Sequence, residues 1–382
     1  MDTAPAAPVA RKPGDRCALD VAGLDALIGA LAAAGYQVIG PVVADGAIIY
    51  GEVRGVADLP AGWGDLQEPA SYRLRRRDDD ARFGYAVGPH SWKRYLFPPR
   101  TLLWRAERSG EEVVVDEPDP AGAPPYAFLG VRGCELAAIR IQDRVFLGSG
   151  TVDPVYAARR EPAFIVAVHC STPAATCFCT SMGTGPAAGE GFDLALTEIL
   201  DGGEPHYLVD VGTERGAAVL AGVPQREALD ADHRQAAAVV EAAAAAIERH
   251  MVPEGLSELL AAKRDHARWD DVANRCLACG NCTMVCPTCF CSTVEDTSSL
   301  DGSTTERWRR WDTCYALEFT HLPDGSVRTS TRSRYRQWLT HKLGTWIDQF
   351  GTSGCVGCGR CISWCPAGID LTEEIRALRE ES

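Results

Sequence analysis

Two segments of the sequence carry cysteines at matching intervals. CLACGNCTMVCP and CVGCGRCISWCP both follow the pattern C-x2-C-x2-C-x3-C-P. In this pattern three cysteines ligate one [4Fe–4S] cluster, and the fourth, which precedes a proline, ligates the other cluster of a pair. The sequence therefore predicts two clusters with crossed ligation. Cluster one takes Cys276, Cys279, Cys282 and Cys365, and cluster two takes Cys355, Cys358, Cys361 and Cys286.

The residues between these cysteines also favour clusters. Pro287 and Pro366 suit a first helical turn, where the missing N–H needs no partner. Gly280 and Gly359 allow the backbone to turn closely around a cluster. Zinc is the competing interpretation, but zinc sites are usually built from CxxC pairs. Two matched triplets, each followed by a CP pair, favour iron–sulfur clusters.

Four more cysteines lie upstream, and we expect them to lie close together. They are Cys134, Cys170, Cys177 and Cys179. The apolar runs AFLGVRGC and FIVAVHC both end in cysteine, so neighbouring parallel strands would bring Cys134 and Cys170 to one sheet edge. These thiols are either ligands of a third cluster or ordinary buried cysteines.

Cys289, Cys291 and Cys314 remain near the two motifs. Three thiols fall short of the four that a cubane normally requires. We therefore expect buried thiols that pack near the clusters, with a further site as the alternative.

Composition limits the class of protein. The chain has 382 residues, sixteen cysteines and a formal net charge of −14, which argues against nucleic acid as its main partner. The N-terminal segment shows no secretory signal, and the most apolar helix-like stretch contains Glu and Arg, so we expect no membrane span. Clustered cysteines without a signal indicate metal sites in a reducing cytoplasm.

A group of cations stands out in this acidic chain. We call it the basic island: Arg307, Arg309, Arg310, Arg328, Arg332, Arg334, Arg336 and Lys342. It is either a solvated or ion-paired face, or a set of cations that raises a cluster potential or anchors a neighbouring subunit.

The order of predicted elements indicates two domains. Residues 1–20 are expected to be a flexible tail, and apolar strands alternate with helices over residues 21–255, which predicts an α/β domain. After residue 256 strand patterns fade and cysteines dominate. We expect residues 256–382 to form an α-helical, ferredoxin-like domain that holds the two clusters.

Six segments together resemble the β subunit of cytoplasmic NAD(P)-linked [NiFe] sulfhydrogenases. They are GPHSWKRYLFPPR, GVRGCELAAIRIQDRVFL, CFCTSMGTGP, CLACGNCTMVCPTCFC, WDTC and CVGCGRCISWCP. The resemblance covers roughly residue 85 onward, and the A subunit of anaerobic sulfite reductase belongs to the same wider family. That family more often has RPCD where this chain has Gly133 and Glu135 around Cys134.

The resemblance implies an iron–sulfur subunit that relays single electrons. Its partners would be a flavin subunit that binds NAD(P) and the small and large subunits of a [NiFe] hydrogenase. One alternative is the A subunit of an anaerobic sulfite reductase, beside a sirohaem subunit; another is a flavin-bearing oxidoreductase. We expect no catalytic residues, because no nucleophile–base pair and no paired carboxylates are evident.

Overall fold

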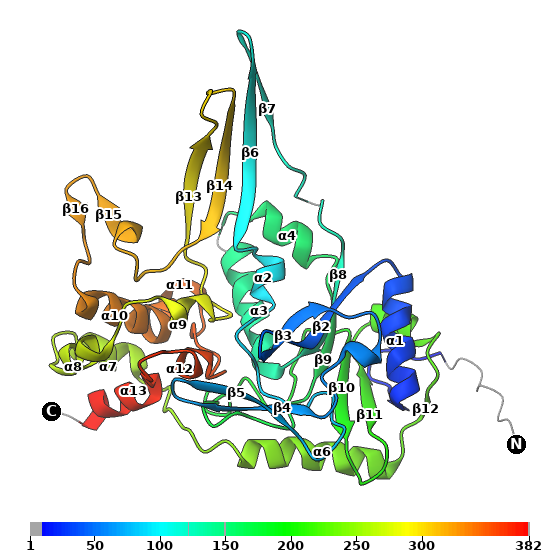
Figure 1. Cartoon of the computed structure of the whole chain (residues 1–382). Helices are drawn as coiled ribbons and strands as arrows, with labels where there is room; N and C mark the ends of the chain where they lie inside the picture. Colours follow the sequence, from blue (N-terminus) through cyan, green and yellow to red (C-terminus); the bar gives the residue numbers. More distant parts are fainter. Residues whose placement is uncertain (1–9, 121, 149, 381–382) are drawn as a thin grey trace, which may run out of the picture.

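A mixed eight-stranded sheet forms the centre of the N-terminal region (Figure 1). The computed structural model of the chain describes residues 10–120, 122–148 and 150–380. The strand order is β12-β1-β11-β10-β9-β8-β2-β3, and neighbours among β2, β8, β9 and β10 are parallel. The strands are β1 (Arg16–Leu19), β2 (Gln37–Ala44), β3 (Ala47–Glu52), β8 (Tyr126–Val131), β9 (Phe164–Val168), β10 (Leu194–Ile199), β11 (His206–Val211) and β12 (Arg226–Glu227).

Helices cover both faces of this sheet, because alternate residues of its strands point to opposite sides. Ala127, Leu129 and Val166 pack in the core beneath α1 and α5. Phe128 and Ile165 pack on the other face, in the core that includes α3. A long helix, α6, follows α5 along the chain. The helices are α1 (Val21–Ala33), α2 (Lys93–Leu96), α3 (Gly133–Phe146), α4 (Pro154–Arg160), α5 (Glu214–Leu220) and α6 (Asp230–Ala245).

The cysteine motifs lie among short helices at one side of the sheet domain (Figure 1). A separate core of aromatic and aliphatic residues, including Trp269, Tyr335 and Leu339, holds these helices together. The helices are α7 (Leu256–Ala262), α8 (Arg268–Arg275), α9 (Asn281–Met284), α10 (Thr331–Thr340), α11 (Trp346–Phe350), α12 (Arg360–Ser363) and α13 (Leu371–Glu380). In the described part of the chain, no helix is both long and apolar enough to cross a membrane.

The C-terminal region is only partly helical, which corrects the prediction. The segment between the two cysteine motifs contains strands β13 (Ser292–Ser298) and β14 (Thr304–Trp311). β14 pairs with β6 (Arg100–Ser109), which in turn pairs with β7 (Glu112–Asp116). Long-range pairing overrides the local sequence preference here, because β14 finds its partner almost two hundred residues upstream. The pairs β4–β5 (Trp63–Glu68, Ser71–Arg76) and β15–β16 (His321–Leu322, Gly325–Ser326) are small hairpins.

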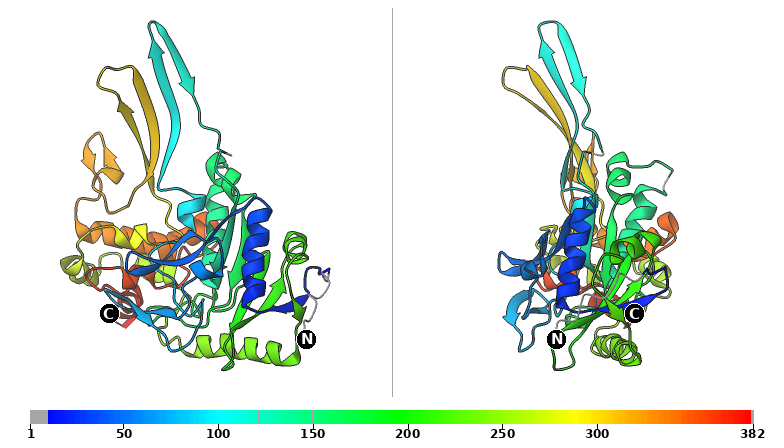
Figure 2. Two further views of the ribbon diagram at one scale, coloured as in Figure 1. Left: turned by 45° about the vertical axis from the view of Figure 1, so that its right-hand side comes forward. Right: turned by 90° about the vertical axis from the view of Figure 1, so that its right-hand side faces the viewer.

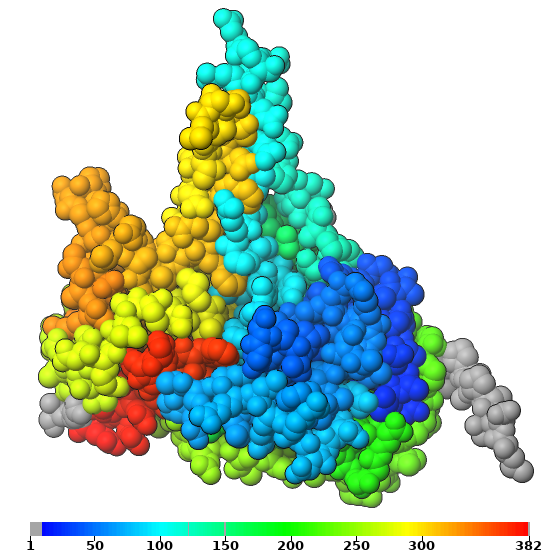
Figure 3. All heavy atoms as spheres, viewed as in Figure 1, coloured from blue at the N-terminus to red at the C-terminus, as the bar shows by residue number. Residues whose placement is uncertain are grey.

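The four strands β13-β14-β6-β7 form an arm that projects from the body in every view (Figures 1, 2 and 3). Val113, Val114 and Val115 of β7 are all exposed, so both faces of that strand meet solvent. β7 is an edge of the sheet, since it is hydrogen-bonded to β6 alone.

Two further predictions concern the limits of the domains. A flexible tail was expected over residues 1–20, but Arg16–Leu19 form strand β1, which pairs with β11 and β12. Residues 1–9 lie outside the described part of the chain. The boundary between residues 255 and 256 stays a prediction, and the β6–β14 ladder crosses it.

A buried ion pair fastens the sheet domain to the second cysteine motif. Glu135 of α3 is 1% exposed and Arg360 of α12 is 0% exposed, and the guanidinium of Arg360 donates to the Glu135 carboxylate. Tyr50 Oη and Trp92 Nε1 also donate to Glu135, at 2.7 and 3.0 Å. Arg360 donates to the carbonyl oxygens of Gly88 and His90 at 2.8 and 2.9 Å. The two buried charges therefore neutralise each other inside the protein, although Nη1 of Arg360 has no hydrogen-bond partner among the described residues.

The Glu135→Gln substitution should strongly destabilise the folded chain. The change leaves the Arg360 cation buried without its counter-charge, so the free energy of unfolding should fall by about 3 kcal/mol. Anaerobic urea unfolding followed by circular dichroism measures this, with Asp296→Asn at a surface ion pair as the control. The double variant Glu135→Gln, Arg360→Met should lose less than the sum of the single variants; additive losses would contradict a coupled pair.

Candidate metal centre

The four cysteines predicted for cluster one line a single cavity. Cys276, Cys279, Cys282 and Cys365 share this cavity with the aromatic side chains of Tyr315, Tyr335 and Trp338. Cys276 follows α8, and Cys282 lies in α9, which begins after Gly280 in the left-handed conformation (φ 77°). A Cβ atom at Gly280 would lie 3.0 Å from the Thr313 side chain, so the turn requires glycine. Two segments that are almost ninety residues apart thus bring their thiols to one apolar cavity.

The four cysteines predicted for cluster two also lie near one another. Burial is the main cause that raises the pKa of Cys355, Cys358 and Cys361, and the nearby Cys286 thiol raises each of them further. Cys286 must therefore lie close to all three thiols. Cys361 also lines the first cavity, so the second motif lies next to the first group of thiols. The ligand assignments themselves, including the crossed ligation, stay predictions.

The four upstream cysteines line a second cavity. Cys134, Cys170, Cys177 and Cys179 share it with Cys358 of the second motif. β8 and β9 are parallel neighbours, as predicted. Cys134 is the second residue of α3, which follows β8, and Cys170 comes two residues after β9. The carboxyl ends of these strands therefore bring both thiols to the same edge of the sheet.

Close backbone packing joins the Cys177 loop to the second motif. Phe178 N–H donates to the Gly357 carbonyl oxygen at 2.8 Å, and Thr184 Oγ1 donates to the Val356 carbonyl oxygen at 2.6 Å. A Cβ atom at Gly357 would lie 2.6 Å from the Phe178 carbonyl oxygen, and one at Gly359 would lie 2.5 Å from that of Thr176. Both glycines have positive φ, so contact and conformation both exclude a larger residue.

Burial makes these thiols reluctant to ionise. It raises the pKa of Cys134, Cys170 and Cys177, and it raises the pKa of Cys179 to about 12. In the second motif, burial raises the pKa of Cys355 to about 12. Thiols in such surroundings are neutral at pH 7 unless a metal binds and replaces the proton. The residues therefore fit iron–sulfur clusters, which would supply electron storage at these positions.

The basic island is largely paired within the chain. Five of its arginines contact carboxylates of the chain: Arg307 with Asp296, Arg309 with Asp153, Arg310 with Glu295, Arg332 with Asp270, and Arg336 with Asp265. Arg334 lies close enough to Cys276 to lower its pKa, although burial has the larger, opposite effect. This pattern agrees with an ion-paired face for most of the island.

Lys342 is the exception, because it is buried against a thiol. Its ammonium donates to Cys286 Sγ, Thr288 Oγ1 and the Gly354 carbonyl oxygen, each at 3.2 Å. It lies in a π-helical turn, η3 (His341–Thr345), between α10 and α11. Such turns are frequent at functional sites, since they redirect side chains within a helix. The sequence indicated a cation near the clusters but not which member of the island it would be.

Two other features of the described residues bear on metal binding. No group of three or more His, Cys, Asp or Glu side chains in these ranges is arranged to hold one metal ion. A polynuclear cluster separates its thiolates further than a single tetrahedral zinc does.

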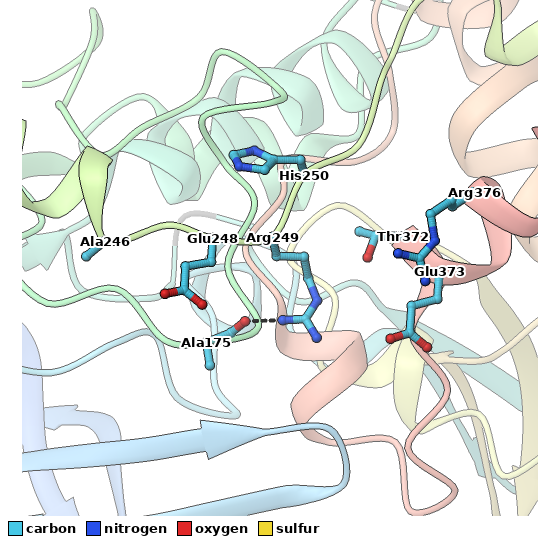
Figure 4. A pocket seen from close by; sticks show the side chains of 8 residues that line it. All are labelled: Ala175, Ala246, Glu248, Arg249, His250, Thr372, Glu373 and Arg376. Carbon is cyan, nitrogen blue, oxygen red and sulfur yellow. Dashed lines mark hydrogen bonds between the residues drawn. The ribbon is translucent and has the colours of Figure 1, made fainter.

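A wider hollow of about 540 Å³ is lined by Arg249, His250 and Glu373 among others and contains no cysteine (Figure 4). Its Arg249 donates to the Ala175 carbonyl oxygen and pairs with Asp370 at 2.6 Å.

Lys342→Met should lower the reduction potential of one cluster by an amount on the order of tens of millivolts. The ammonium stabilises the added electron, so its loss disfavours reduction. Redox titration followed by EPR measures the shift, and Arg336→Gln on the paired surface is the control. If the predicted ligation is right, the shifted signal is the one that Cys358→Ser removes. If the Lys342→Met change shifts the signal that Cys279→Ser removes, the predicted ligation of cluster two by Cys286 is wrong.

Comparison with known proteins agrees with this cysteine arrangement. Residues 275–369 match the family described as 4Fe-4S dicluster domain. The chain is 32% identical over 323 residues to sulfhydrogenase 2 subunit beta of Pyrococcus furiosus, an alignment that covers 83% of this chain and 92% of that protein. No solved structure matches the chain. The chain therefore belongs to the family of sulfhydrogenase β subunits, iron–sulfur proteins with a dicluster domain.

Proposed function

We propose that the chain is the electron-transfer subunit of a cytoplasmic, NAD(P)-linked [NiFe] hydrogenase complex of the sulfhydrogenase type. It relays single electrons between a flavin subunit that binds NAD(P) and the small and large subunits of the hydrogenase. Its membership of the sulfhydrogenase β family supports the type of complex. All sixteen cysteines are free thiols in the structure, which agrees with a reducing compartment.

One observation carries the proposal: the second motif contributes thiols to both cavities. Cys361 lines the cavity of Cys276, Cys279 and Cys282. Cys358 lines the cavity of the four upstream cysteines. The three groups of thiols are therefore consecutive neighbours, with the second motif in the middle. An electron relay requires such a series of sites, each close to the next.

The chain's own residues set the properties of each site in this series. Buried apolar surroundings disfavour charge, and N–H groups that point at sulfur offset that effect. The N–H groups of Ala278 and Gly357 donate to Cys276 Sγ and Cys355 Sγ, at 3.4 and 3.5 Å. Lys342 adds a full positive charge beside Cys286. We infer that these differences in hydrogen bonding and charge give the sites different potentials.

The complex itself provides the direct test. Purification of the native chain under anaerobic conditions should recover a flavin subunit and a [NiFe] pair. These subunits are identified by mass spectrometry of the copurified chains together with nickel and flavin analysis. Recovery of a sirohaem protein without nickel would instead identify the A subunit of an anaerobic sulfite reductase.

We further propose that Cys134, Cys170, Cys177 and Cys179 ligate a third [4Fe–4S] cluster. Four thiols around one cavity, three of them on buried residues and Cys170 half-buried, match the number that a cubane requires. The double variant Cys177→Ser, Cys179→Ser should lose about four irons per chain and keep the EPR signals of the dicluster domain. Cys17→Ser, at a buried thiol of β1 that does not line the cavity, should lose none. An unchanged iron content in the double variant would leave the four cysteines as structural thiols.

A further inference from the structure

A hollow lined by arginines lies between α10, the region of α7 and the segment that follows β16. We call it the basic groove, and its volume is about 470 Å³. Arg264, Arg328 and Arg336 line it together with Leu260 of α7, and no acidic residue is among the described residues of its lining. Three cations around one hollow are notable in a chain whose formal net charge is −14.

Two of these arginines have no counter-charge at contact distance. Arg336 pairs with the Asp265 carboxylate at 3.5 Å and donates to the Arg264 carbonyl oxygen at 2.7 Å. Within the described ranges, the guanidinium groups of Arg264 and Arg328 form no ion pair with a carboxylate. Arginine stays protonated in proteins, so these charges do not depend on pH. The basic groove therefore presents positive charge that no neighbouring carboxylate of the described chain neutralises.

Exposed aliphatic side chains accompany this charge. The β15–β16 hairpin stands out from the body beside α10 (Figures 1 and 3). Leu322 of β15 and Val327, which follows β16, are 56% and 60% exposed, and Val327 also lines the basic groove. The acidic residues of this segment, Glu318 and Asp324, do not line it. Because binding surfaces between proteins combine apolar contact area with arginines, this composition is typical of a docking surface.

Helix α10 lies between the basic groove and the cavity of the cysteines predicted for cluster one. One face of the helix, with spacings of three and four residues, lines the groove: Ser333, Arg336, Gln337 and Thr340. Tyr335 and Trp338, on another face of the same helix, line the cavity. A protein bound in the groove would therefore be separated from that cavity by a single helix.

We propose that the basic groove docks a small, soluble, acidic electron-carrier protein, which transfers single electrons to the chain at the site of Cys276, Cys279, Cys282 and Cys365. The inference rests on the proposed electron-transfer function and adds an external carrier to the flavin subunit. In each transfer the reduced carrier is oxidised by one electron and the chain is reduced by one. No covalent bond forms or breaks.

The size and chemistry of the groove favour a transient partner over a permanent subunit. Permanent interfaces bury large, predominantly apolar areas. Contacts between redox proteins lie at the small end of the range, and opposite charges speed their encounter. A hollow dominated by arginines, with a few exposed aliphatic residues beside it, has the second character. Carboxylates on the carrier would supply the counter-charges that Arg264 and Arg328 lack within the chain.

The test measures how fast a reduced protein carrier reduces the oxidised, anaerobically purified full-length chain in stopped-flow experiments. The probe is a purified, strongly acidic iron–sulfur ferredoxin. Arg264→Gln, Arg328→Gln should lower the second-order rate constant about tenfold at low salt and make it less sensitive to NaCl. Arg264→Lys, Arg328→Lys keeps the charges and should retain most of the rate. Arg307→Gln, Arg310→Gln removes two positive charges from the arm and is the matched control, with an unchanged rate constant.

A second reductant separates docking from damage to the metal centre. Reduced methyl viologen is a cation, so Arg264→Gln, Arg328→Gln should leave its rate constant unchanged or raise it. Equal slowing with both reductants would overturn the proposal, as would a ferredoxin rate constant equal to that of the unmodified chain. Loss of a subunit from the native complex of this variant would identify a permanent interface and would also overturn it. Absence of dicluster EPR signals from the unmodified chain would instead refute the proposed function.

Discussion

The buried contact between Glu135 and Arg360 is the constraint on which the arrangement of thiols depends. Glu135 lies one residue after Cys134, and Arg360 lies one residue before Cys361. The pair therefore fixes the distance between the upstream cysteines and the second motif. Its other partners, Tyr50, Trp92 and the carbonyl oxygens of Gly88 and His90, belong to the sheet domain and its connecting segments. Rotation of one domain against the other would break these contacts and leave the charges of Glu135 and Arg360 without their partners.

Charge balance explains why an acidic protein places cations in its interior. Each cluster with its thiolates carries negative charge, and the protein must offset that charge at the depth where the cysteines lie. Arg360 lowers the pKa of Cys358 against the larger effect of burial, and Lys342 does the same for Cys355. Without metal, these cations would face neutral thiols. The metal-free chain should therefore be less stable than the loaded one, since metal binding and folding are coupled in such sites.

The sequence allowed the local features of the site to be predicted. Cysteine spacing indicated the two matched motifs, and apolar runs ending in Cys134 and Cys170 indicated neighbouring parallel strands. Contacts between distant residues had no such local pattern. The partners Glu135 and Arg360 are 225 positions apart, and β14 pairs with β6 across a similar interval.

The projecting arm ends in an edge strand, β7, with one side free of strand partners among the described residues. Val113, Val114 and Val115 are 53%, 55% and 59% exposed on an edge strand that contains no lysine, proline or bulge to block pairing. Acidic residues flank these valines on both sides, from Glu111 and Glu112 to Asp116 and Glu117. Two copies of this edge would bring like charges together and repel each other. The same acidic residues would attract the edge of an apolar strand that has basic residues at its ends. Added salt would weaken both the repulsion and the attraction.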